Sequence, residues 1–132
     1  MKPEQLRDLV RYRMEQARET LAEAAILRDA GAFRGAVSRS YYAMFYALLG
    51  LLATRQLGAS KHTGAIALCD REFVKTGIFP PELSRSLHLA FQRRQVHDYG
   101  EVIHADLSAA NESIQDAAQF VEAIESYLAP QD

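Results

Sequence analysis

Apolar residues recur at steps of three and four through almost the whole chain, and no stretch alternates as a half-buried strand does. This periodicity predicts helices over 3–30, 33–55, 62–75, 82–98 and 105–128. Because long helices with short connections favour antiparallel neighbours, we expect an all-α, up-and-down antiparallel bundle of four to five helices. The last helix has the cleanest stepping, through Leu107, Ala110, Ile114, Ala117, Val121, Ile124 and Leu128.

The length and composition are those of one compact globular domain. The 132 residues are 48% apolar and 24% charged, and no linker or low-complexity tract divides them, so residues 1–132 are expected to form a single domain. The net charge of −2 argues against nucleic-acid binding by bulk attraction alone.

A cytoplasmic location is expected. Cys69 is the only cysteine, so no intramolecular disulfide can form, and the first residues lack the apolar core of a signal peptide. The richest apolar stretch, 41–53, is shorter than the roughly 20 residues that a membrane-spanning helix needs. We therefore expect no membrane partner.

The predicted helix 82–98 breaks its own apolar pattern. Its core stepping passes through Phe91 and then continues onto Arg94, His97 and Asp98. Because an unpaired buried charge is costly, such residues need partners or a function. Two interpretations follow. Arg94 can pair with Asp98 one turn later while His97 and Tyr99 finish the helix; or these residues line a polar cleft, where the arginine holds a phosphate and the histidine moves a proton.

Three segments, in this order, resemble the signatures of the HEPN-domain family. Residues 38–47 (SRSYYAMFYA) are similar to its second-helix motif, and 61–64 (KHTG) with 73–77 (FVKTG) are similar to the segment before and through its third helix. Residues 94–99 (RQVHDY) resemble the R-x-x-x-D-Y box of a small branch of the family. The resemblance covers roughly residues 33–100.

The resemblance implies a four- or five-helix bundle that commonly forms a homodimer and is usually encoded beside a minimal nucleotidyltransferase in toxin–antitoxin-like modules. Active members are metal-independent endoribonucleases, whose arginine and histidine line a cleft at the dimer interface in an R-x4-6-H motif. Here three residues separate Arg93 from His97, and two separate Arg94 from His97. In related toxins the partner enzyme adenylylates the tyrosine two positions after the histidine, which implies Tyr99 as a modification site.

Two functions therefore remain open. One is a toxin-type protein that binds or cleaves RNA or nucleotides, and the other is a non-catalytic dimeric module that partners or regulates a nucleotidyltransferase. No cofactor or metal is expected. Lysine and histidine at the start of the predicted third helix can contact a phosphate there. The predicted site comprises Arg94 and His97 as catalytic residues, with Arg94, Asp98, Tyr99, Arg93, Lys61 and His62 as binding residues.

Other patterns favour structural roles. Glu101 and His104 have the E-x-x-H spacing of di-iron bundles, but no second such motif faces them. The segment 58–64 lacks the residue order of a phosphate-binding loop. Aromatic residues at helical spacing within 41–46 predict packing in the core or a dimer interface rather than base stacking. The tyrosine hydroxyls then need partners, for which Arg39 and Arg94 are candidates.

Overall fold

The computed structural model describes residues 1–99 and 105–130, and the side chains of 1–96 and 105–130. Over these residues the secondary structure is entirely helical, which confirms the all-α bundle. The observed ends of the helices lie within a few residues of the expected ones. The elements are α1 (Pro3–Asp29), α2 (Phe33–Ala53), α3 (His62–Cys69), the π-helix η1 (Asp70–Val74), α4 (Pro81–Tyr99) and α5 (Leu107–Leu128).

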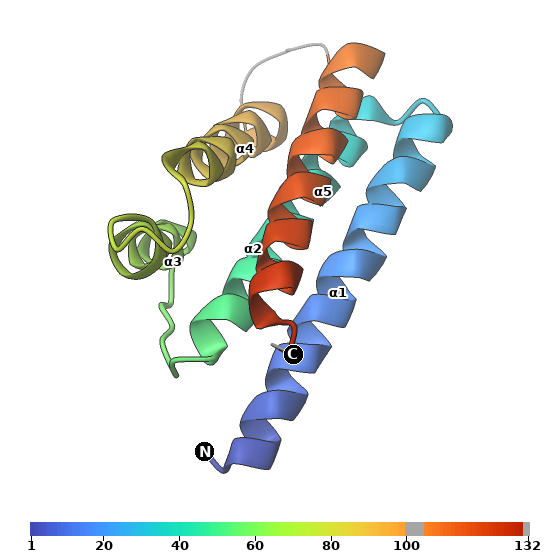
Figure 1. Ribbon diagram of the computed structural model, residues 1–132. Coiled ribbons are helices and arrows are strands. Elements are labelled where there is room, and N and C mark those ends of the chain that lie inside the picture. Colours follow the sequence, from blue (N-terminus) through green and yellow to red (C-terminus); the bar gives the residue numbers. More distant parts are fainter. Residues whose placement is uncertain (100–104, 131–132) are drawn as a thin grey trace.

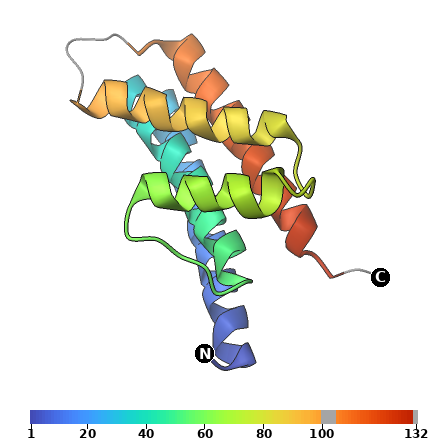
Figure 2. The same ribbon diagram turned by 90° about the vertical axis from the view of Figure 1, so that its left-hand side faces the viewer.

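Helix α2 is the central element. Helices α1, α2 and α5 run side by side along the long axis of the molecule (Figure 1), and α3 and α4 run across them (Figure 2). Helix α2 packs against each of the other four α-helices. It is also the most apolar of the long helices, with twelve buried residues among its 21. Helices α3 and α4 therefore pack against the side chains that α2 directs away from α1 and α5.

The turn between α1 and α2 follows from local sequence. Gly31 takes a left-handed backbone conformation with φ of +80°. Its N–H donates to the carbonyl of Arg28, and the N–H of Ala32 donates to that of Leu27, which closes a Schellman motif. Farther along, a Cβ on Gly50 would lie 3.1 Å from Met14 Sδ, so glycine permits the close approach of α2 to α1.

The expected helix 62–75 is an α-helix whose last turn widens into the π-helix η1. The carboxylate of Asp70, the first residue of η1, accepts a hydrogen bond from Ser84 Oγ at 2.5 Å and lies 2.7 Å from His88 Nε2. Both partners belong to α4. This cluster ties η1 to α4 and so helps to fix how α3 and α4 lie across α2.

Ser113 in α5 is 4% exposed, and its Oγ is the only buried side-chain polar atom without a hydrogen-bond partner among the described residues. A buried hydroxyl with no partner carries a desolvation penalty. We expect Ser113→Ala to raise the free energy of unfolding by about 1 kcal/mol, measured by urea denaturation. The exposed Ser126→Ala on the same helix controls for helix propensity, and an equal change in both variants would contradict the explanation.

Candidate functional site

Side chains from three helices meet around the guanidinium of Arg94. We call this group the Arg94 cluster and define it as Tyr41, Tyr42 and Phe45 from α2, His62 from α3 and Arg94 from α4. Tyr41 is fully buried, whereas the other four side chains are partly buried. The cluster therefore lies where the core meets the surface, between α2, α3 and α4.

Arg94 is oriented by the two tyrosines. Its Nη2 donates to Tyr42 Oη at 2.7 Å, and its Cζ lies 5.2 Å from the centroid of the Tyr42 ring and 5.9 Å from that of Tyr41. Arg39 lies over the Tyr42 ring as well, with its Cζ 5.7 Å from the centroid. The expectation that Arg94 provides a tyrosine hydroxyl with a partner is confirmed. This arrangement combines cation–π attraction with a directed hydrogen bond.

His62 is oriented by the hydroxyl of Tyr41. Its Nδ1 lies 2.7 Å from Tyr41 Oη, and its ring stacks on Phe45 with centroids 3.9 Å apart and planes 12° apart. Burial and, second, the positive charge of Arg94 lower the pKa of His62 below its ordinary value. Burial raises the pKa of Tyr41, so its hydroxyl keeps its proton. The cluster thus holds a neutral imidazole beside a guanidinium.

The structure does not bring every predicted site residue into this cluster. Arg93 faces α5, where Nη1 donates to Asp116 at 3.2 Å and Nη2 lies 3.6 Å from Glu112. Lys61 is exposed at the N-terminal end of α3, with no hydrogen bond or ion pair to the described residues. The side chains of the three remaining predicted residues lie outside the described part of the structure; these residues are His97, Asp98 and Tyr99.

Other candidate reactive and metal-binding groups are less favourable than the Arg94 cluster. Burial raises the pKa of the Cys69 thiol to about 12, so it is a poor nucleophile. Among the described side chains, no three histidine, cysteine or acidic residues are placed to hold a metal ion. Glu101 and His104, which have the E-x-x-H spacing but for which no metal site is predicted, lie outside the described residues. None of the described helices is long and apolar enough to cross a bilayer.

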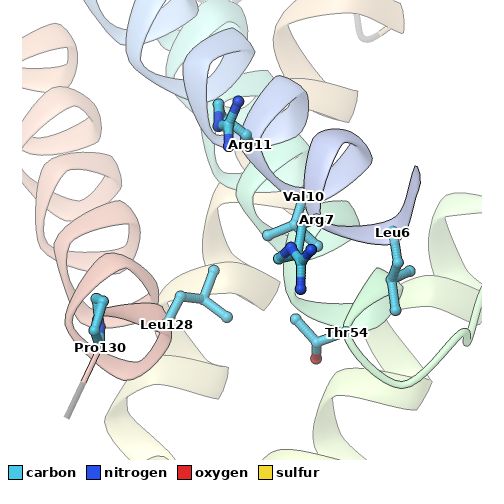
Figure 3. Close-up of a pocket in the computed structure, with 7 residues that line it drawn as sticks. All are labelled: Leu6, Arg7, Val10, Arg11, Thr54, Leu128 and Pro130. Carbon is cyan, nitrogen blue, oxygen red and sulfur yellow. The ribbon is translucent and has the colours of Figure 1, made fainter. Parts of the chain in front are cut away.

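A pocket of about 540 Å³ lies at the C-terminal end of α2 (Figure 3). Residues at the start of α1, the end of α2 and the end of α5 line it, whereas the Arg94 cluster packs against the middle of α2. Its only charged residues are Arg7 and Arg11, and no acid–base group is among its described lining residues. The pocket offers space without a proton-transfer group, and is lined by Leu6, Arg7, Val10, Arg11, Thr54, Leu128 and Pro130.

The sequence identified the arginine of this cluster but not its surroundings. Periodicity placed Tyr41 and Tyr42 in packing roles, and it placed His62 at a helix start as a phosphate contact. No local spacing shows that α3 crosses α2 at Tyr41. One sequence signal could have found these surroundings. Two adjacent tyrosines in the most apolar long helix each need a hydrogen-bond partner for the hydroxyl.

Comparison with known proteins decides the family. The sequence matches the HEPN domain over residues 10–127. The chain belongs to the HEPN domain family. The HEPN match covers most of all five α-helices, including α1 and α5. A solved structure agrees with the fold, because TT1696 from Thermus thermophilus superposes with a TM-score of 0.79 at 21% identity, over 90% of this chain and 98% of that one.

Relatives of this HEPN chain include proteins of almost the same length. A UPF0332 protein of Thermotoga maritima is 37% identical over 91% of this chain and 91% of its own. The Methanocaldococcus jannaschii protein named "Putative toxin MJ0142" is 30% identical over 87% of this chain and 78% of its own. A second relative from that organism, "Putative toxin MJ0605", is 31% identical over 93% of this chain and 91% of its own. The chain is thus similar to proteins that are named as toxins.

The charge of Arg94 is expected to control the titration of His62. Replacing Arg94 with glutamine removes a nearby cation that disfavours the imidazolium, so the pKa of His62 should rise. It should stay below the ordinary value of 6.5, because burial is the larger cause and remains. Imidazole NMR signals followed against pH measure this shift. Arg93→Gln is the matched control, since Arg93 faces α5, and an equal shift in both variants would contradict the assignment.

Proposed function

We propose that this HEPN protein is a toxin-type, metal-independent endoribonuclease and that Arg94 holds the phosphate at which RNA is cleaved. The observation that carries the proposal is a guanidinium and an imidazole in one partly buried cluster, each oriented by a tyrosine hydroxyl at 2.7 Å. The name "Putative toxin" of two relatives supports the toxin-type part of the proposal. The proposal accounts for charged and titratable groups at positions where the helix period predicts core.

The chemistry requires two kinds of group. In metal-free cleavage the ribose 2′-hydroxyl loses its proton and attacks phosphorus, the P–O5′ bond breaks, and the 5′-oxygen gains a proton. A planar guanidinium binds phosphate oxygens in pairs and stabilises the charge that develops on them. A histidine moves protons near neutral pH. From the sequence, His97 is proposed for proton transfer, with Asp98 and Tyr99 orienting the site.

The second candidate function is a non-catalytic dimeric module that partners a minimal nucleotidyltransferase. The exposed apolar residues of α4 favour it, because Leu89 is 42% exposed and Val96 is 39% exposed. They stand seven residues apart and thus share one face of the helix. Apolar side chains grouped on one face are suited to contact with another protein, whether a second copy or a different partner.

The test is cleavage of labelled RNA by the purified protein in excess EDTA. A second RNA of the same sequence carries 2′-O-methyl groups, so it lacks the attacking hydroxyl. We expect cleavage of the first RNA alone, leaving 2′,3′-cyclic phosphate and 5′-hydroxyl ends. The reaction should weaken in His97→Ala if that residue transfers a proton. If the wild-type protein cleaves no RNA while remaining folded, the nuclease proposal is wrong and the interaction module is favoured.

A further inference from the structure

We infer that His62, held by Tyr41, is the general base that removes the proton from the attacking 2′-hydroxyl. This inference rests on the proposed ribonuclease function and assigns a step within it. It adds to the site a histidine from α3, which lies 32 residues before Arg94 in the sequence and meets it only through the crossing of the helices.

The bond to Tyr41 decides which nitrogen of His62 reacts. Nδ1 lies 2.7 Å from Tyr41 Oη, so Nε2 is the nitrogen left for the substrate. Among the described residues Nε2 has no hydrogen-bond partner, yet Ser113 Oγ is the only unpartnered buried polar atom of the described side chains. Nε2 is therefore not fully enclosed by the described residues. When Nδ1–H donates to Tyr41 Oη, the Nε2 lone pair is available to accept a proton.

The imidazole is held on several sides. Phe45 stacks on it at 3.9 Å, Tyr42 meets it edge to face at 5.9 Å, and Phe91 of α4 lies 6.4 Å away, all between ring centroids. A side chain locked by packing and by a hydrogen bond loses little further freedom when it reacts. This packing distinguishes His62 from His88, whose side chain is 49% exposed.

The electrostatic surroundings favour the uncharged imidazole of His62. The groups that face it are Tyr41 and Tyr42 of α2 and Arg94 of α4, and no described carboxylate contacts it. Burial and the charge of Arg94 lower its pKa, so the imidazole is unprotonated at neutral pH. Arg94 and His62 pack against the same two tyrosine rings, which places the phosphate-binding group and the base side by side.

The step is balanced without a co-reactant. Nε2 takes the proton of the 2′-hydroxyl as the O2′–P bond forms. The P–O5′ bond breaks, and its electrons leave with the 5′-oxygen, which takes a proton from His97, the residue proposed above for proton transfer. His97 regains a proton from water, and the proton that His62 then releases neutralises the hydroxide. The guanidinium of Arg94 compensates for the negative charge on the phosphate oxygens throughout.

The experiment compares RNA cleavage in EDTA by the wild type, His62→Gln and His88→Gln across a pH range from acidic to alkaline. His62→Gln should lower kcat/KM by about 10²–10⁴-fold, the usual contribution of a general base. It should also abolish the decline of kcat/KM on the acidic side of the profile. His88→Gln should behave as the wild type does, because His88 lies outside the Arg94 cluster and glutamine keeps a hydrogen-bond donor for Asp70. Binding of the 2′-O-methyl RNA should be nearly unchanged in both variants.

Tyr41→Phe is the second variant, in case His62→Gln does not fold. It keeps the imidazole but removes the hydroxyl that orients it, so kcat should fall about tenfold or more with KM little changed and the acidic limb displaced. Unchanged kcat and pH profile in Tyr41→Phe, or undiminished cleavage by His62→Gln, would overturn the assignment of His62 and leave the ribonuclease proposal intact. If the wild type does not cleave RNA, both proposals are wrong.

Discussion

Replacing Phe73 with alanine is expected to lower the free energy of unfolding by about 3–5 kcal/mol. Phe73 lies in η1 and is fully buried, with Phe79 at 6.1 Å and Tyr127 at 6.2 Å between ring centroids. The guanidinium of Arg55 lies 4.3 Å from its ring. The substitution therefore removes a side chain that joins the end of α2, η1 and α5, and it leaves a cavity that these elements cannot close without moving.

Urea denaturation measures this loss, which is a large part of the roughly 5–15 kcal/mol typical of a domain. The matched control is Ile26→Ala, because Ile26 is 67% exposed on α1. That variant should stay within about 0.5 kcal/mol of the wild type. A loss below about 1.5 kcal/mol for Phe73→Ala would show that η1 contributes little to the core, contrary to its burial.

Replacing Arg94 with alanine is expected to reduce RNA cleavage by about 10²–10³-fold, the effect of removing one group that stabilises transition-state charge. The loss should appear mainly in kcat, since negative charge on the phosphate oxygens is greatest in the transition state. Initial rates in EDTA at saturating RNA measure it. Arg94→Lys keeps the charge but not the planar paired donors, so its rate should lie between those of the alanine variant and the wild type.

Arg85→Ala is the control for Arg94. Arg85 lies on the same helix, its side chain is 68% exposed, and it pairs with Glu82 outside the Arg94 cluster. The control should cleave RNA as the wild type does, and thermal melting establishes that each variant is folded. Full cleavage by Arg94→Ala would remove the phosphate-binding role from Arg94 and leave its contact with Tyr42 as a packing interaction.

The helices could be predicted because each is encoded by neighbouring residues. The apolar stepping of α5 predicted 105–128 where the structure has Leu107–Leu128, and Gly31 marked the end of α1. The expected helix 62–75 was right in extent, yet its last part is a π-helix. Nothing in local periodicity separates α-helical from π-helical hydrogen bonding when Asp70 takes its partners from α4.

The candidate site was predictable only in part. Arg94 stood out because a charge fell on an apolar stripe, which is a property of one helix. Arg93, its neighbour in sequence, points instead to carboxylates of α5, and one residue is a rotation of about 100° around an α-helix. Spacing alone could not decide which arginine faces α2. That choice depends on how α4 is rotated when it packs.

The sequence by itself determined the helices, the all-α class and the unusual polarity of the last turns of α4, because these follow from periodicity and from the cost of burying charge. The tertiary structure alone decided which residues surround Arg94. Tyr41 and Tyr42 are adjacent, and their hydroxyls reach different helices, His62 of α3 and Arg94 of α4. The physical reason is that hydrogen bonds between helices depend on crossing geometry, to which residues far apart in the chain contribute together.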